Sequence, residues 1–282
     1  MRRFPSWFVA LVLVSSTAIL FAASRSNTEA SAASSFLGFD ANDYPGDDAL
    51  PVLHKTFSFT SFWLGPAPGE KQTTWLGKRA LLESRGFGFV VLYNGRESRK
   101  LKSLADAHQK GGIDAQTAAS LARQEGFPSG TVIFLDIEEG GRLAESYHEY
   151  VRAWFDELAR LRFHAGAYCS AVPVAEGQGN TIITARDLQD HLDGRKLIFW
   201  IFNDVCPPSP GCVFANIPPL SQGGFPAEVW QYAQSPRRKE RTANCAASYA
   251  ADGNCYAPGD TAHKWFIDAN VARTANPSAP RD

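Results

Sequence analysis

The chain has 282 residues, with 28 Lys and Arg, 29 Asp and Glu, and a formal net charge of -1. Hydrophobic residues make up 44% and charged residues 20%, which is typical of globular proteins and excludes a disordered or fibrous chain. The length allows one large domain or two small ones, and the charge gives no basic field that would favour a nucleic-acid partner.

Residues 1–32 are predicted to be a secretory signal peptide with a short linker. Arg2 and Arg3 precede Phe4–Ser24, a stretch without charged residues that has an apolar middle and small residues after it. The alternative is an uncleaved anchor, because the apolar run nearly reaches the ~20 residues of a bilayer span. The paired arginines are a weak indication of the twin-arginine route. We expect a secreted or cell-envelope protein with no membrane span after signal cleavage.

The cysteines agree with export to an oxidising compartment. Cys206 and Cys212 flank a tight Pro-rich loop, and Cys245 and Cys255 flank a Gly/Asn loop, so two local disulfides are the simple interpretation. Cys169 is left as a buried free thiol. The sequence has no CxxC pair and no HExxH spacing, and we expect no metal site.

After the signal, short β-like apolar runs alternate with helix-like segments. Several runs are almost continuously apolar, as expected for parallel strands buried on both faces. The eight runs are Phe36–Asp40, Thr56–Trp63, Gly88–Tyr93, Val132–Ile137, Ala165–Cys169, Leu197–Phe202, Glu228–Tyr232 and Trp265–Asp268. This alternation predicts a single α/β domain, a (β/α)8 TIM-type barrel over residues 33–273 with a less regular second half. An open doubly wound sheet is the alternative, but no Gly-rich phosphate turn supports it. Residues 274–282 are predicted to be a disordered tail.

Four helices are predicted between the runs. Arg142–Arg160 has the clearest apolar face at helical spacing. Asp114–Glu125 carries Ala and Leu at helical spacing and begins with Asp114 as its cap. Lys78–Ser84 and Ala185–Leu192 are shorter.

Carboxylates stand at the ends of three of these runs. Asp40 ends the first run, Asp136 and Glu138 end the fourth, and Asp268 ends the last. Residues i and i+2 of a strand share a face, so Asp136 and Glu138 point the same way, about 6–7 Å apart along the strand. The first and eighth strands of a barrel are neighbours, so Asp40 and Asp268 would join the same cleft from the other side.

Several acids around one cleft cannot all ionise at their ordinary pKa. A protonated acid beside an ionised one is the equipment of glycoside hydrolysis. Acids at strand ends also cap helices and pair with arginines, but their occurrence at three separate ends favours a site.

The chain resembles the Rv2525c-like family of glycoside-hydrolase-like domains, once described as a domain of unknown function. That family is in turn similar to the family 25 lysozymes, which are muramidases on a (β/α) barrel. The matching pieces keep their order across nearly the whole mature chain: GFDANDYPG at 38–46, GGIDAQTAASLA at 111–122, IFLDIE at 133–138, GAYCS at 166–170, VWQYAQ at 229–234 and FIDANV at 266–271.

The resemblance implies roles for the acids. Glu138 matches the general acid of the lysozymes, and Asp136 matches the partner carboxylate of their DxE motif. Asp40 and Asp268 match the acids on the first and last strands. The implied substrate is the glycan of bacterial peptidoglycan, cut beside N-acetylmuramic acid, with no cofactor.

The resemblance also implies a sugar-binding cleft. Tyr168, Trp230 and Gln231 match positions that line it, and Asn270 of the last motif is taken with them as substrate-binding. Other tryptophans are expected to pack in the core or at the rim, and the basic residues at 237–241 are expected to form a solvated loop.

Two other functions remain open. One is a non-catalytic glycan-binding envelope protein on the same barrel, since a fold and a site can persist while catalysis is lost. The other is a structural envelope protein held by its N-terminal segment. We expect a monomer in each case.

Overall fold

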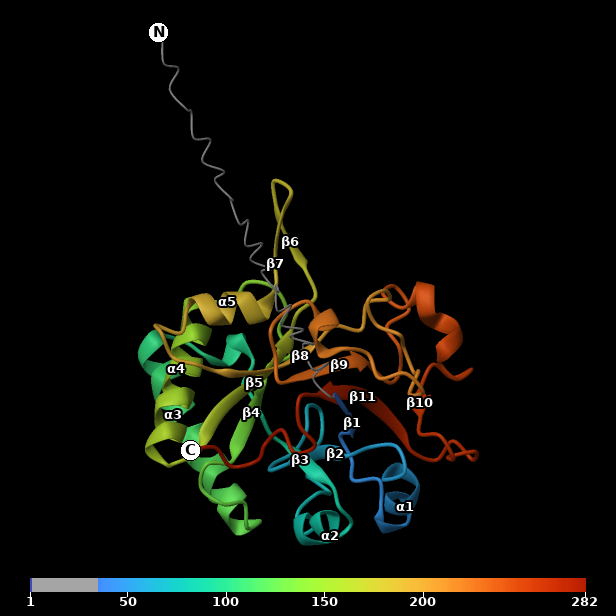
Figure 1. Cartoon of the computed structure of the whole chain (residues 1–282). Helices are drawn as coiled ribbons and strands as arrows, with labels where there is room; N and C mark the ends of the chain where they lie inside the picture. The colour runs from blue at the N-terminus through green and yellow to red at the C-terminus, as the bar shows by residue number, and fades with distance from the viewer. Residues whose placement is uncertain (2–34) are drawn as a thin grey trace. The chain divides into compact units, whose positions relative to one another are not determined.

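A computed structural model describes Met1 and residues 35–282 of the chain (Figure 1). Apart from Met1, the predicted signal peptide and linker at residues 1–32 lie outside the described residues. Within the described part, no helix is both long enough and apolar enough to cross a membrane.

Eight strands form a closed barrel, which confirms the predicted fold (Figure 1). Each predicted run overlaps one of them. In order around the barrel they are β1 (Phe36–Asp40), β2 (Phe59–Trp63), β3 (Gly88–Asn94), β4 (Val132–Asp136), β5 (His164–Ser170), β8 (Ile198–Phe202), β9 (Val229–Ala233) and β11 (Phe266–Ala272). Pairing of β1 with β11 closes the barrel and excludes the open sheet.

The last strand departs from the regular (β/α)8 pattern. Strands β1 to β9 of the barrel pair in parallel, whereas β11 is antiparallel to both of its neighbours, β9 and β1. The start of β11 therefore lies at the mouth formed by the carboxyl ends of the other strands. Asp268, the third residue of β11, stands opposite Asp40, the last residue of β1.

An α-helix follows each of the first five barrel strands, and the described residues show none after the last three. The helices are α1 (Leu50–Leu53), α2 (Arg79–Ser84), α3 (Leu104–Gln124), α4 (Glu145–Arg160) and α5 (Thr184–Asp190). A hairpin of β6 (Val174–Gly177) and β7 (Asn180–Ile182) precedes α5 and projects from the barrel (Figure 1). The short strand β10 (Cys255–Tyr256) pairs with β11. The second half is therefore less regular, as predicted.

Helix α3 begins ten residues before the predicted start. Its N-cap is Ser103, whose Oγ accepts a hydrogen bond from the Asp106 backbone N–H. Asp114 is not a cap but a buried residue inside the helix. Gly111, inside the helix, allows α3 to approach α4, since an added Cβ would lie 2.3 Å from the Tyr150 carbonyl oxygen.

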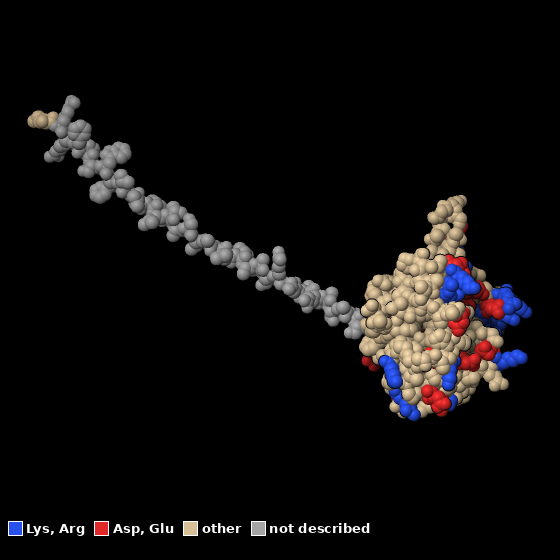
Figure 2. All heavy atoms as spheres, turned by 90° about the vertical axis from the view of Figure 1, so that its right-hand side faces the viewer, with Lys and Arg blue, Asp and Glu red and all other residues tan. Residues whose placement is uncertain are grey.

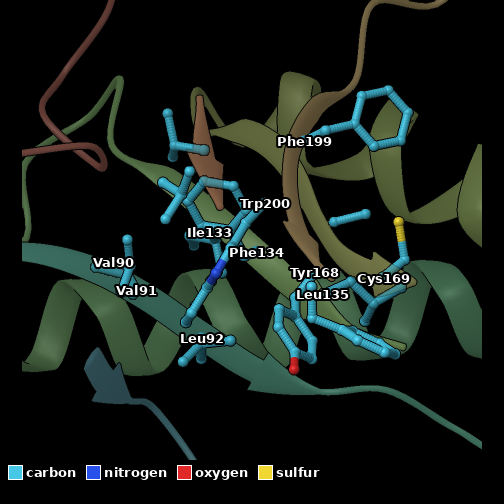
Figure 3. Packing of buried hydrophobic residues seen from close by; sticks show 14 of the residues in the cluster. Val90, Val91, Leu92, Ile133, Phe134, Leu135, Tyr168, Cys169, Phe199 and Trp200 are labelled. Carbon is cyan, nitrogen blue, oxygen red and sulfur yellow. The ribbon is translucent and has the colours of Figure 1, made fainter. Parts of the chain in front are cut away.

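Aromatic side chains fill much of the core (Figure 3). Trp200 makes edge contacts with Phe134 and Tyr168, at ring-centroid distances of 5.9 and 4.9 Å. Tyr168 and Cys169 are successive residues of β5 and turn away from one another, so that Tyr168 faces the barrel interior (Figure 3). Cys169 is buried and free, as predicted.

The predicted disulfide pairing is wrong. Cys206 pairs with Cys245, and Cys212 pairs with Cys255. The loop after β8 is therefore joined twice to the segment after β9, instead of each loop being closed on itself. Because β8 and β9 are neighbours in the barrel, the segments that follow them lie side by side, and this proximity brings together cysteines that are far apart in the sequence.

The predicted disorder of residues 274–282 is also wrong. The tail packs against the start of β3, opposite the mouth: Asn276 Oδ1 accepts from the Phe89 N–H and Ser278 Oγ accepts from the Val91 N–H, both at 2.9 Å. The Ser278 carbonyl accepts from Val132 in β4. Backbone donors that the barrel leaves unpaired thus give the tail a fixed place.

Charged side chains of both signs are interspersed on the surface shown in Figure 2. Neither sign gathers into a continuous patch on that face.

Candidate functional site

The four predicted acids meet in one pocket at the barrel mouth. This central pocket has a volume of about 370 Å³, and Asp40, Asp136, Glu138 and Asp268 all line it. Asp40 and Asp136 end their strands, and Glu138 follows two residues after Asp136. Asp268 reaches the same mouth because β11 runs in the opposite direction.

Gln231 connects the acids on one side of the mouth. Its Nε2 donates to Asp40 Oδ1 at 3.0 Å and to Asp268 Oδ2 at 3.3 Å. Its Oε1 accepts from the Tyr168 hydroxyl at 2.7 Å and from Gln234 Nε2 at 3.0 Å. The amide is thereby fixed in one orientation, with its donor toward the acids.

Asn270 contacts Asp40 from the buried interior of the barrel. Its Nδ2 donates to Asp40 Oδ1 at 2.6 Å, and its Oδ1 accepts from the Trp200 indole N–H at 2.9 Å. Asn270 is fully buried and does not line the central pocket. Its contact with a ligand would therefore be indirect, through the carboxylate of Asp40.

Burial is the main cause of the raised pKa values of Asp40 and Asp268 on this side of the mouth. It raises the pKa of Asp40 to about 6, against the opposing effect of the hydrogen bonds from Gln231 and Asn270. Burial and the nearby charge of Asp40 raise the pKa of Asp268 well above its ordinary range, although the Ser235 N–H donates to Asp268 Oδ1 at 2.6 Å. Two close carboxyl groups here therefore resist being ionised together.

Asp136 and Glu138 form the opposite side. Asp136 is 3% exposed, and its Oδ2 has no hydrogen-bond partner among the described residues. Burial, followed by the charge of Glu138, raises the pKa of Asp136 well above its usual range. Glu138 is exposed to solvent at the mouth, yet the surrounding walls remove part of its water and raise its pKa as well. The pair thus holds a proton more firmly than an isolated carboxyl group.

One charged residue that acts on the site, Arg238, was not identified from the sequence. Arg238, expected in a solvated loop, forms a bidentate ion pair with Asp204, whose side chain is fully buried. Its guanidinium lies over the ring of Phe202, 5.3 Å from the centroid. The positive charge of Arg238 opposes the rise in the pKa of Glu138. Asn203 and Asp204 directly follow β8, and nothing in the sequence distinguished the buried Asp204 from a surface acid.

The structure places one predicted binding residue elsewhere. Trp230 is fully buried, does not line the central pocket, and donates its indole N–H to the Asn203 carbonyl at 3.0 Å. Neighbouring residues of a strand point to opposite faces, so the inward orientation of Gln231 turns Trp230 outward. Trp63 and Trp200 line the pocket instead, although their indole rings are almost completely buried.

The mouth extends on both sides of the central pocket. An outer pocket of about 400 Å³ shares Asp40, Asn42, Ser235 and Asp268 with it. A side pocket of about 550 Å³ shares Pro68, Asp136 and Glu138 with it. The acids therefore lie in the middle of a continuous groove, which suits an extended ligand better than a compact one.

One group of side chains outside the mouth has the composition of a metal site. His148, Asp187 and His191 place ligand atoms within 4.8 Å of one another in the described part of the chain. The Asp187 carboxylate already accepts from His148 Nε2 and from the Leu143 N–H, both at 2.8 Å. The two imidazole rings are stacked in parallel at 4.1 Å. This hydrogen bonding and ring stacking joins α4 to α5.

Comparison with known proteins supports the fold and the family. A family model described as Rv2525c-like, glycoside hydrolase-like domain matches residues 70–243. No curated protein sequence matches the chain. Among solved structures, an uncharacterized B. stearothermophilus protein has 16% identity and a TM-score of 0.53, with 84% of this chain and 95% of that one covered.

Two further solved structures are similar at lower scores. The Tat-secreted protein Rv2525c of Mycobacterium tuberculosis has 16% identity and a TM-score of 0.47, with 84% of this chain and 94% of that one covered. A family GH25 lysozyme from Aspergillus fumigatus has 14% identity and a TM-score of 0.45, with coverages of 85% and 94%.

Proposed function

Since this chain belongs to the Rv2525c-like, glycoside hydrolase-like domain family, we propose that it is an exported glycoside hydrolase that acts on bacterial cell-wall glycan. The observation that carries the proposal is the central pocket, in which two pairs of carboxyl groups face one another across a groove open to solvent. Peptidoglycan is the proposed polymer, because the ordered motifs resemble those of the muramidases.

Glu138 is proposed as the general acid. A general acid must carry a proton and reach the oxygen of the bond that breaks. The raised pKa of Glu138 favours its protonated form, and its exposure at the mouth gives it access to the groove. Asp136 is proposed as its partner carboxyl group, because the charge of Glu138 acts on the buried Asp136, which itself has little access to the groove.

The positive charge that develops on the sugar needs an ionised carboxylate. Asp136, the partner carboxylate of the DxE motif, suits this role poorly, because burial raises its pKa well above its usual range. Asp40 suits the role better, since a pKa of about 6 leaves Asp40 ionised at neutral pH and two amides donate to it. We therefore assign charge stabilisation to the side of Asp40 and Asp268, across the pocket from the acid.

The test is incubation of the purified protein with peptidoglycan and analysis of released fragments by mass spectrometry. We expect new reducing ends at N-acetylmuramic acid from the parent and none from Glu138→Gln. Glu83→Gln, an exposed carboxylate on α2, serves as the matched control and should behave as the parent.

Two results would contradict this proposal. Turnover by Glu138→Gln at the parent rate would remove Glu138 from the role of general acid. Binding of glycan by the folded parent without any new reducing ends would favour the non-catalytic alternative.

A further inference from the structure

The outer pocket has no role in the proton transfer proposed above, yet it adjoins the central pocket. It shares Asp40, Asn42, Ser235 and Asp268 with the central pocket and is also lined by Tyr44, Trp265 and Phe266. A ligand bound between the acids can therefore extend past Asp40 and Asp268 while remaining in contact with the protein.

Phe266 is unusual in its exposure. Its side chain is 56% exposed, and it is the one Phe, Trp or Tyr among residues 35–282 that is exposed. The other Phe, Trp and Tyr residues of this part of the chain are buried or half-buried. Leaving a large ring in water forgoes the free energy of apolar burial. The exposed ring of Phe266 lines the outer pocket, together with Asp40 and Asp268.

The position of Phe266 follows from the alternation of β11. Phe266, Asp268 and Asn270 share one face of the strand, and along it they pass from exposed through half-buried to buried. Phe266 thus lies about 7 Å outside Asp268 along the strand. The ring is directed to the same side as the acid, at the outer end of the groove.

Both walls of the outer pocket are held in place. Phe266 is paired with Tyr256 of β10, and the neighbouring Cys255 is joined by a disulfide to Cys212. The buried carboxylate of Asp260 accepts from the Trp265 N–H at 2.9 Å.

The opposite wall is fixed by two tryptophans. Trp63 donates its indole N–H to the Ala41 carbonyl at 3.1 Å, and Trp75 donates to the Asn42 carbonyl at 2.9 Å. A preformed pocket of this kind loses little conformational freedom when a ligand binds.

We propose that the outer pocket is a second sugar-binding subsite, in which Phe266 and Trp265 pack against a ring of the glycan chain that occupies the central pocket. The C–H face of a pyranose ring offers apolar surface to an aromatic ring, and its hydroxyl groups need polar partners at the edge. Trp265 and Phe266 supply the first, and the acids shared with the central pocket supply the second. This inference rests on the proposed glycan substrate, and it makes recognition depend on chain length.

The experiment measures affinity for glycan strands freed of their peptides, as disaccharides and as hexasaccharides, by calorimetry. The Glu138→Gln background prevents turnover during the titration. Phe266→Ala is expected to weaken hexasaccharide binding by about three- to tenfold and to leave disaccharide binding unchanged. Phe266→Tyr keeps the ring and should retain the parent affinity. Ile113→Ala, an exposed apolar residue on α3, is the control for loss of apolar surface.

The outcomes separate this inference from the proposed function. Equal hexasaccharide affinity of Phe266→Ala and its parent overturns the subsite and leaves the hydrolase proposal standing. If hexasaccharide binding requires the Phe266 ring, but the protein with Glu138 intact releases no fragments from peptidoglycan, the subsite is supported and the hydrolase proposal is overturned. Failure of the parent to bind the hexasaccharide overturns both.

Discussion

Asp268 lies directly opposite Asp40 in the antiparallel pairing of β11 with β1, and one amide group, that of Gln231, donates to both. Two carboxyl groups from opposite ends of the chain are thereby held together at the seam where the barrel closes. The two carboxyl groups therefore come together only when β11 pairs with β1 and closes the barrel.

Asp40→Asn is expected to stabilise the protein at neutral pH. Burial raises the pKa of Asp40 to about 6, whereas an Asp in the unfolded chain titrates near ~3.9. Between these values the folded protein binds a proton that the unfolded chain has released, so stability falls as pH rises through this window. The substitution should raise the free energy of unfolding at pH 7.5 by roughly 2 kcal/mol more than at pH 4.5.

Urea denaturation at the two pH values measures this difference. Asp48→Asn, at an exposed position before α1, should show no such dependence. An equal effect of Asp40→Asn at both pH values would mean that Asp40 titrates normally.

Arg238→Met is expected to destabilise the fold and to change the titration of Glu138. Loss of the guanidinium leaves the buried carboxylate of Asp204 without its ion-pair partner. Because Arg238 is partly exposed, we expect a cost of about 2–3 kcal/mol, at the lower end for buried pairs. The pKa of Glu138 should rise, since Arg238 holds it down.

Chemical denaturation and carboxyl-carbon NMR titration report the two effects of Arg238→Met. Lys239→Met removes an exposed neighbouring charge and is the matched control. An unchanged titration of Glu138 would show that Arg238 acts on stability alone.

Ser278→Ala tests whether the C-terminal tail is part of the fold. The substitution removes the acceptor of the Val91 N–H in β3, which is buried. A buried donor left without a partner costs about 1–3 kcal/mol. Amide hydrogen exchange at Val91 should therefore accelerate, whereas Thr274→Ala, at an exposed position, should have no effect. Unchanged protection at Val91 would indicate that the tail is dispensable.

Gly111 and Gly112 should respond in opposite directions to alanine. At Gly111 an added Cβ would lie 2.3 Å from the Tyr150 carbonyl oxygen and 2.9 Å from the Ala153 Cβ, so α3 and α4 must separate. We expect a loss of about 1–3 kcal/mol. At Gly112 the space is open, and alanine should gain up to about 1 kcal/mol from helix propensity. Thermal melting compares the two variants, and a shared direction would contradict the packing of α3 on α4.

The barrel and the meeting of the acids could be predicted because both depend on local patterns. Each strand is a short apolar run, and each of Asp40, Asp136 and Glu138 lies at or just beyond the end of one. Parallel strands bring their carboxyl ends to one mouth, so the convergence followed from topology alone. Asp268 was expected at the mouth as the last residue of a strand. In the structure it lies near the start of β11, which runs antiparallel to its neighbours and therefore begins at the mouth.

The features that could not be predicted depend on neighbours in space. The orientation of Trp230 follows from the inward position of Gln231, and the crossed disulfides follow from the adjacency of β8 and β9. Arg238 lies in a loop with other basic residues, and only its ion pair with the buried Asp204 distinguishes it from them. The polar tail at 274–282 looked unstructured because its partners are backbone groups of β3, which no side-chain pattern reveals.

The reversed direction of β11 also determines where the two ends of the segment 35–282 lie. Residue 35 precedes the start of β1, and the tail after Arg273 runs beneath the starts of β3 and β4, so both ends lie on the floor of the barrel. A fusion partner, fluorophore or solid support attached at either end would leave the groove unobstructed. The molecule can therefore be tethered for single-particle or surface measurements with its acids facing the solution.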